Sequence, residues 1–136
     1  TGRYAIKDSG VVLDPETGVE WYRCAFGQRH TLRGCMGEAL LVTYDEVDSM
    51  LAEISIKAGQ QWRLPTESEF LALKEPRCHV PAMNTNVFPN PLIDNFWVQG
   101  ERERANKACA VYTYNLGRSC RLLGNDPRPF YMVKGG

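Results

Sequence analysis

The stretch Gly59-Gln-Gln-Trp-Arg-Leu-Pro-Thr-Glu-Ser-Glu-Phe70 contains the end of one helix and the start of another. Gly59 suits the left-handed conformation of the residue that follows a helix C-terminus. Pro65 disfavours helical geometry at the residue before it, so the second helix cannot begin earlier. Thr66 and Glu69 have the spacing of a capping box, in which each side chain bonds to the other residue's backbone N–H. The pattern therefore predicts two helices joined by a short extended connection.

Apolar residues on both sides of this connection predict the core. We expect Trp62, Leu64 and Phe70 to be buried, because they interrupt an otherwise polar stretch at strand and helix spacings. A second capping box, Thr43-Tyr-Asp-Glu46, opens the first helix, which we expect to run to about residue 58. Spacings of three and four predict one buried face on this helix, formed by Val47, Met50, Leu51, Ile54 and Ala58.

Short apolar segments separated by turn residues predict strands at both ends of the chain. The expected strands are 3–7, 11–13, 19–23, 96–98, 107–114, 119–123 and 130–133. We expect residues 24–37 to form a loop, and residues 77–95 an irregular segment in which Phe88 and Ile93 enter the core. A two-residue turn at Leu116-Gly117 would close the hairpin between the strands at 107–114 and 119–123. Strands at both ends with two helices between them predict an α+β domain.

Several segments resemble one protein family, in the family's order. The stretch Trp62 to Phe70 resembles the Arg-Leu-Pro-Thr-Glu signature of the formylglycine-generating-enzyme branch of C-type-lectin-like folds. The whole set resembles the Lcl C-terminal domain family, which is named for a collagen-like bacterial surface adhesin. The set comprises residues 11–24, 27–28, 35–37, 62–70, 87–90, 95–97 and 131–136. The resemblance implies one C-type-lectin-like domain over residues 1–136, with two helices, short antiparallel strands and termini close together in the sheet.

Composition fits a single globular domain. The 136 residues are 43% hydrophobic and 24% charged, and no apolar run has the length of a membrane span. The chain begins at Thr1-Gly2 without a signal peptide, which we interpret as an excised or processed domain. Residues 1–96 hold 9 Lys+Arg and 13 Asp+Glu, a net charge of −4, whereas residues 97–136 hold 7 and 3, a net charge of +4. The basic C-terminal end is therefore a candidate surface for anionic ligands.

Five cysteines favour an oxidising compartment, with two disulfides and one free thiol. They fit no zinc pattern with His30 or His79. The cysteines are Cys24, Cys35, Cys78, Cys109 and Cys120. The family resemblance implies a Cys24–Cys35 disulfide. A two-residue turn at Leu116-Gly117 would place Thr113 opposite Cys120, which makes a Cys109–Cys120 bridge too long and leaves Cys78 to pair with either cysteine.

Enzymatic, cofactor and metal sites are not indicated. The chain has no GxSxG, HExxH or phosphate-binding loop, and no match to the surroundings of the reactive cysteine pair of the formylglycine-generating enzyme. Glu67 and Glu69 could form a carboxylate pair, but Glu69 is explained by capping. Calcium lectins carry Glu-Pro-Asn, Gln-Pro-Asp or Trp-Asn-Asp, all absent here. Asp94, Asn95 and Asp126 could offer oxygens to calcium, although such residues in loops usually form turns.

The better candidate site is the basic C-terminal set with two tyrosines. Arginine forks match sulfate and phosphate groups, and tyrosine rings offer flat faces to sugars or to a protein partner. The predicted ligand-binding residues are Arg102, Arg104, Lys107, Tyr112, Tyr114, Arg118, Arg121 and Arg128, with Lys134 nearby. The alternative is a solvated surface, since Glu101 and Glu103 alternate with two of the arginines. We expect charge reversal at Arg118 and Arg121 to weaken binding with little effect on stability, and reversal at Arg29 and Arg33 to matter less.

The family resemblance implies the function. The Lcl domain binds glycosaminoglycans at the tip of a trimeric stalk, so we expect a non-enzymatic adhesin domain on the extracellular side of a bacterium. Its expected partner is an anionic polysaccharide, such as a sulfated one, or a cell-surface protein, not nucleic acid, and the resemblance implies a homotrimer in the parent protein. The alternative is a protein-recognition or structural tip module of a pilus, stalk or phage-like fibre, with no glycan site.

Overall fold

A computed structural model describes residues 3–8, 10–99, 108–120 and 126–135 of the chain. Its helices are α1 (Tyr44–Ala58) and α2 (Glu67–Leu71). Its strands are β1 (Ala5–Asp8), β2 (Val11–Asp14), β3 (Val19–Tyr22), β4 (Arg29–Thr31), β5 (Gly34–Met36), β6 (Asn95–Val98), β7 (Cys109–Tyr112), β8 (Gly117–Ser119) and β9 (Val133–Gly135). The predicted mixed α and β architecture is confirmed.

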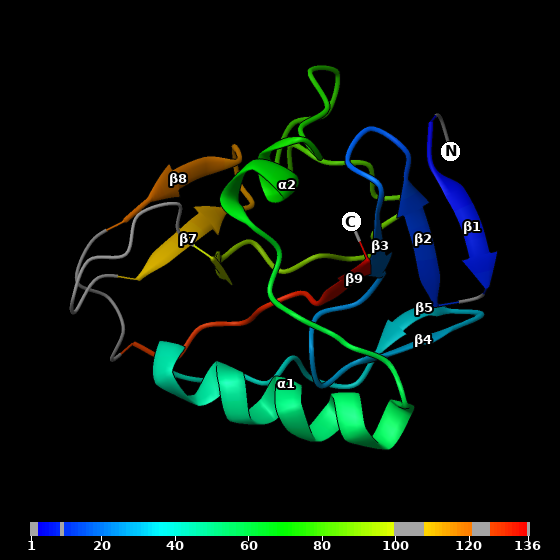
Figure 1. Cartoon of the computed structure of the whole chain (residues 1–136). Helices are drawn as coiled ribbons and strands as arrows, with labels where there is room; N and C mark the ends of the chain where they lie inside the picture. Colours follow the sequence, from blue (N-terminus) through cyan, green and yellow to red (C-terminus); the bar gives the residue numbers. More distant parts are fainter. Residues whose placement is uncertain (1–2, 9, 100–107, 121–125, 136) are drawn as a thin grey trace.

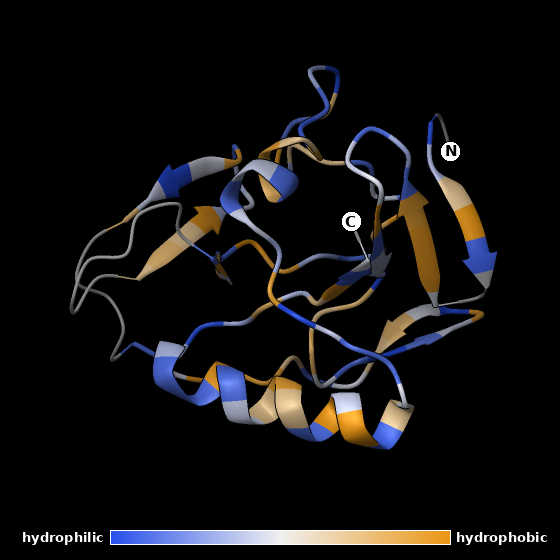
Figure 2. Ribbon diagram, viewed as in Figure 1, coloured by the Kyte–Doolittle hydropathy of each residue, from blue (hydrophilic) through white to orange (hydrophobic). Residues whose placement is uncertain are grey.

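The strands form three antiparallel sheets, with the orders β1-β2-β3-β9, β4-β5 and β6-β7-β8. In Figure 1, α1 lies below the two larger sheets, and α2 lies above, between them. The first and last strands share one sheet, but they form its two edges, with β2 and β3 between them. Figure 2 shows that β2 and β7 are largely hydrophobic, which fits their central places in these sheets.

The core is organised around Trp21, which is fully buried on β3. Its ring makes edge-to-face contacts with Phe70, Phe88 and Tyr131 at centroid distances of 5.5, 5.6 and 6.0 Å. A second apolar cluster lies between α1 and the β6-β7-β8 sheet and includes Trp62 and Leu64. The prediction that Trp62, Leu64 and Phe70 are core residues is therefore confirmed, although the largest fully buried side chains are those of Trp21 and Trp97.

Both predicted helix starts are confirmed. At α2, the Glu69 carboxylate accepts the Thr66 N–H at 2.8 Å, and the Thr66 hydroxyl accepts the Glu69 N–H at 3.2 Å. At α1, the Glu46 carboxylate accepts the Thr43 N–H at 2.8 Å. Gly59 follows α1 with φ +66°, as expected for a left-handed residue after a helix. The two helix starts are predictable from the sequence because each capping bond joins residues only three apart.

Three expectations about the core and loops were wrong. Residues 24–37 contain the β4–β5 hairpin rather than a plain loop. Ala58 is exposed, and Ser55 takes the buried place on α1 because its Oγ accepts the Trp62 N–H at 2.9 Å. Ile93 is 42% exposed, since the Leu92 carbonyl is held by the Thr113 hydroxyl and Leu92 packs against the core instead.

Candidate functional site

Two disulfides fix two hairpins. The expected Cys24–Cys35 bridge is confirmed, with 5.6 Å between the Cα atoms. The second bridge, whose partners the sequence left open, joins Cys109 to Cys120 at a Cα separation of 4.1 Å, so the two-residue turn that would exclude this pairing was wrong. Cys78 is left as a half-buried free thiol.

The register of the β7–β8 hairpin explains this correction. Tyr112 pairs with Gly117 and Ala110 with Ser119, so the turn spans residues 113–116 and Cys109 comes opposite Cys120. Leu116 adopts φ +54°, and its N–H bonds to the Tyr112 carbonyl at 2.7 Å. The Leu116 side chain is 3% exposed, so its burial favours this longer turn over the two-residue turn expected from the sequence.

The second disulfide also removes a candidate metal site. Ligand atoms of Glu67, Cys109 and Cys120 all lie within 4.8 Å of one another. Metal binding requires cysteine thiolates, and here both sulfurs are consumed in the disulfide. We therefore read the Glu67 carboxylate as the partner of Arg118, whose Nη1 lies 2.8 Å from it.

Tyr112 and Tyr114 form a stacked, exposed pair on this hairpin. Their rings lie 5.7 Å apart between centroids at an interplanar angle of 15°, and the residues are 37% and 48% exposed. Thr113 between them is buried and hydrogen-bonded, which sends both tyrosine side chains to the outer face. Gly117 lies opposite Tyr112 and has no side chain to cover the ring. The two rings therefore offer a flat surface held by a cross-linked hairpin.

The cations predicted beside these rings are dispersed over the described part of the molecule. Arg118 lies opposite the inward-facing Val111, so its side chain lies on the other face of the hairpin from Tyr112, towards Glu67. Arg128 bonds to Asp126 at 3.0 Å and covers the Trp97 ring at 5.6 Å. Each of these charges is thus engaged within the protein.

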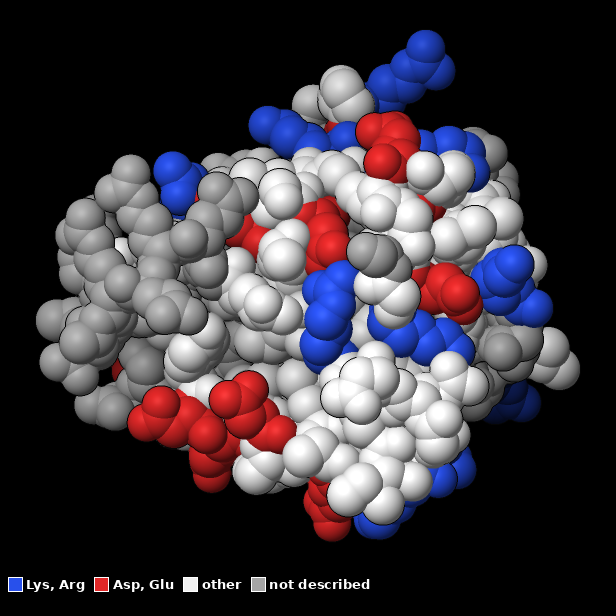
Figure 3. Space-filling model, in the orientation of Figure 1, with Lys and Arg blue, Asp and Glu red and all other residues white. Residues whose placement is uncertain are grey.

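The remaining basic residues of the predicted C-terminal set do not join the tyrosine pair in one basic patch among the described residues. The Lys134 ammonium lies 5.1 Å from the Trp62 ring centroid and bonds to Gln60 at 2.8 Å. Arg102, Arg104, Lys107 and Arg121 lie outside the described residues, so their part in a site stays a prediction. Figure 3 shows scattered basic groups on this face and a cluster of acidic groups over the start of α1. A single basic surface is therefore not formed by the described residues of the set.

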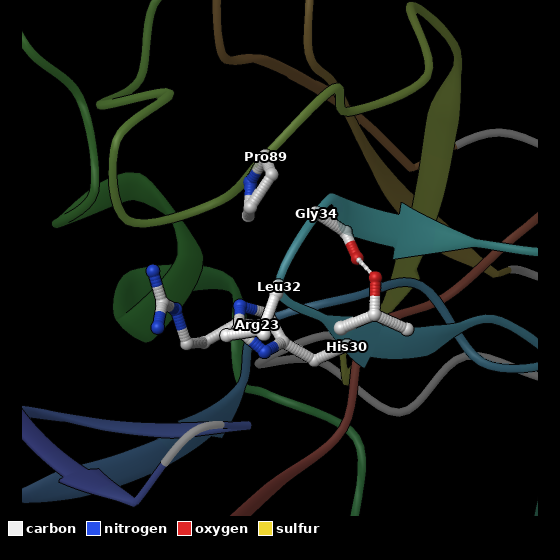
Figure 4. Close-up of a pocket in the computed structure, with 6 residues that line it drawn as sticks. Arg23, His30, Leu32, Gly34 and Pro89 are labelled. Carbon is white, nitrogen blue, oxygen red and sulfur yellow. Dashed lines mark hydrogen bonds between the residues drawn. The ribbon is translucent and has the colours of Figure 1, made fainter.

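Sequence reasoning missed a pocket beside the β4–β5 hairpin. The pocket has a volume of about 490 Å³ and is lined by Arg23, His30, Thr31, Leu32, Gly34 and Pro89 (Figure 4). Pro89 lies across the opening from His30 and Leu32. The signal that could have indicated it is a pair of cysteines enclosing Arg29-His30-Thr-Leu-Arg33, a basic segment without an acid.

Arg23 is held in place at this pocket. Its Nε and Nη2 donate to the Val87 and Asn86 carbonyls at 2.8 and 3.0 Å. Burial lowers the pKa of Arg23, which nevertheless stays far above neutral pH because guanidinium groups are effectively always protonated. The pocket wall therefore carries a fixed positive charge.

Comparison with known proteins identifies the family. The model of the Lcl C-terminal domain matches residues 10–128. The chain belongs to the Lcl C-terminal domain family. The Lcl match covers both the pocket beside β4–β5 and the tyrosine pair on β7–β8, so both are parts of the domain itself. No curated protein and no solved structure matches the chain.

The disulfides of this Lcl domain bear on the compartment in which it folds, and its helix lengths on whether a helix could cross a membrane. Two disulfides in a domain of this size are typical of proteins that fold in an oxidising compartment outside the cytosol. Within the described residues, neither helix is long and apolar enough to cross a membrane.

Proposed function

We propose that this Lcl domain is the non-enzymatic ligand-binding domain of a surface-displayed adhesin, and that it recognises anionic, sulfated glycans. The observation that carries the proposal is the exposed Tyr112–Tyr114 stack on a hairpin closed by a disulfide. Rigid aromatic faces bind flat apolar surfaces, such as one side of a sugar ring, at a low cost in side-chain entropy. Membership of the Lcl family supports a role at a bacterial surface.

The proposal extends to the fold and setting. We infer a C-type-lectin-like fold of the formylglycine-generating-enzyme branch from the Arg63-Leu-Pro-Thr-Glu67 signature and from the shared sheet of β1 and β9. The two disulfides support display on the extracellular side of a bacterium. A homotrimeric parent protein is part of the same proposal. The four basic residues outside the described ranges remain predicted members of the binding site.

Retention on a heparin column, measured as a function of salt, tests this function. We expect the domain to be retained at low salt and released near physiological salt, because contacts between arginines and sulfates are screened. The double variant Tyr112→Ala/Tyr114→Ala should bind about tenfold more weakly, since aromatic contacts contribute about 0.5–1.5 kcal/mol each.

Ile56→Ala is a matched control, because Ile56 is an exposed apolar residue on α1, 83% accessible, away from the hairpin. A glycan array would then name the preferred saccharide. Failure of the wild-type domain to bind any anionic glycan would contradict the proposal and favour the protein-recognition tip module.

A further inference from the structure

We propose that the pocket beside the β4–β5 hairpin is a separate binding site for the carboxylate or sulfate group of an acidic sugar. The assignment of an oxyanion rests on the pocket itself, whereas the assignment of a sugar rests on the proposed function. This site lies within residues 1–96, whose net charge of −4 predicts a weaker contribution to binding than that of the basic C-terminal end.

The pocket has the size and the mixed lining of a small-ligand site. Its volume of about 490 Å³ lies within the usual range for such sites, roughly 300–1,000 Å³. Arg23, His30 and Thr31 supply polar groups, Pro89 supplies an apolar wall, and Leu32, which is fully exposed, adds apolar surface. This combination suits a ring with an apolar face and a charged substituent. An oxyanion is the favoured substituent because a guanidinium donates charge-assisted hydrogen bonds to it.

The hairpin that carries these groups is preorganised. The Tyr22 hydroxyl accepts the backbone N–H of His30 at 3.0 Å, and the Thr31 hydroxyl donates to the Gly34 carbonyl at 3.0 Å. His30 lies opposite Cys35, whose disulfide to Cys24 ties the hairpin to the end of β3. Little conformational entropy therefore remains to be lost when a ligand binds.

Gly34 shapes the wall beside Pro89. Its backbone adopts φ +101°, a conformation that residues with a side chain rarely adopt. A Cβ at this position would lie 3.4 Å from the Pro89 Cβ. Any larger residue at this position would strain the turn and narrow the pocket.

The hairpin beside the pocket carries further positive charge. Arg29 and Arg33 are both exposed, and among the described residues neither has a carboxylate partner. By contrast, Arg118 and Arg128 in the C-terminal set are each paired with an acid. These two arginines therefore add uncompensated positive charge to the hairpin that supplies His30, Thr31, Leu32 and Gly34 to the pocket.

The experiment is an NMR titration of the whole domain with three small probes. Glucuronate carries a carboxylate, 6-O-sulfated N-acetylglucosamine carries a sulfate, and N-acetylglucosamine carries no charge. We expect one or both acidic probes to shift the backbone amide signals of His30, Thr31 and Gly34, and the neutral probe to leave them unchanged. The comparison of the two acidic probes identifies which oxyanion the pocket prefers.

Two variants test which arginines contribute to binding of the acidic probe. Arg29→Gln/Arg33→Gln alters only exposed side chains, and we expect it to weaken binding of the acidic probe about tenfold, because it removes two positive charges from the hairpin beside the pocket. Arg23→Lys keeps the positive charge but loses the planar fork that bonds to the Val87 and Asn86 carbonyls, and it should weaken binding of the acidic probe similarly; a thermal melt checks its fold. Lys7→Gln/Lys57→Gln, which removes the same charge from exposed sites on β1 and α1, is the control.

The outcomes separate this site from the proposed function. The proposed pocket is wrong if neither acidic probe shifts the hairpin signals, or if Arg29→Gln/Arg33→Gln binds the acidic probe as tightly as the wild type. Either result would rule out the pocket even if the domain is still retained on heparin through Tyr112 and Tyr114. Hairpin shifts with an acidic probe, together with no retention of the wild type on heparin, would support the pocket and contradict the polysaccharide-binding function.

Discussion

Glu67 and Arg118 form an ion pair between a buried carboxylate and an exposed guanidinium. The Glu67 Oε1 lies 2.8 Å from the Arg118 Nη1, and their side chains are 7% and 60% exposed. The pair joins the start of α2 to β8, two elements about fifty residues apart in the chain. Arg118 thus stabilises the Glu67 carboxylate, which has little access to water. Charge reversal at Arg118 is therefore expected to affect stability as well as binding.

Arg118→Glu should lower the free energy of unfolding by about 1–3 kcal/mol, because it leaves Glu67 unpaired and adds a second negative charge. Urea denaturation measures this. Glu67→Gln/Arg118→Gln should recover most of the loss, since no buried charge then lacks a partner. Arg29→Glu, at an exposed position without a carboxylate partner among the described residues, is the control. Equal urea midpoints for Arg118→Glu and Arg29→Glu would contradict the role given to the pair.

Trp21→Ala should destabilise the domain more than Trp62→Ala. Trp21 is fully buried and touches three aromatic rings, whereas Trp62 is 7% exposed and lies at the edge of the second cluster near Lys134. Truncation of a buried tryptophan costs about 3–5 kcal/mol, which is enough to unfold a marginal domain. Thermal melts of Trp21→Phe and Trp62→Phe keep the comparison measurable if the alanine variants do not fold. A lower melting temperature for Trp62→Phe would reverse our ranking.

The Arg63–Glu69 pair should contribute to stability at neutral pH and lose that contribution in acid. Burial alone would raise the pKa of Glu69, but hydrogen bonds from Arg63 and from the Thr66 N–H outweigh it and hold the pKa below 4.5. In the unfolded chain the carboxylate takes up a proton at higher pH than in the folded chain. The contribution is therefore present above pH 4.5 and lost as the pH falls through the lower, folded value.

Glu69→Gln tests this, because glutamine keeps the capping bond and removes the charge. The variant should be less stable than the wild type by about 1 kcal/mol at pH 7, and the difference should shrink below pH 4.5. Denaturation curves at several pH values measure it. A difference that stays constant down to pH 2 would assign the effect to packing instead of charge.

The cysteine pairing predicts the chemical behaviour of the native protein. Peptide maps under non-reducing conditions should show Cys24 linked to Cys35 and Cys109 linked to Cys120, with Cys78 alone alkylated. Cys24→Ser/Cys35→Ser should cost about 3 kcal/mol, as chain entropy predicts for a loop of this length. A linked peptide that contains Cys78 would show that the pairing is wrong.

Local features of the chain were predictable. The starts of α1 and α2, the glycine after α1 and the burial of Trp62, Leu64 and Phe70 all follow from residues within a few positions of one another. The Cys24–Cys35 bridge and the family were also anticipated, through ordered segments that resemble the Lcl domain. Each of these depends on short-range bonds or on a pattern read directly from the chain.

The sequence by itself therefore determined where both helices begin and where α1 ends, because the capping bonds and the glycine after α1 act within a few residues. Only the tertiary structure decided the β7–β8 register, the partner of Arg118 and the pocket at Arg23. A shift in hairpin register changes which side chains face each other, and it is settled here by burial of Leu116. Arg23 reaches the carbonyl of Val87, 64 residues away, and no local pattern indicates such a contact. Long-range packing brings charged side chains into contact with residues that are distant in the sequence, and these contacts cannot be read from local patterns.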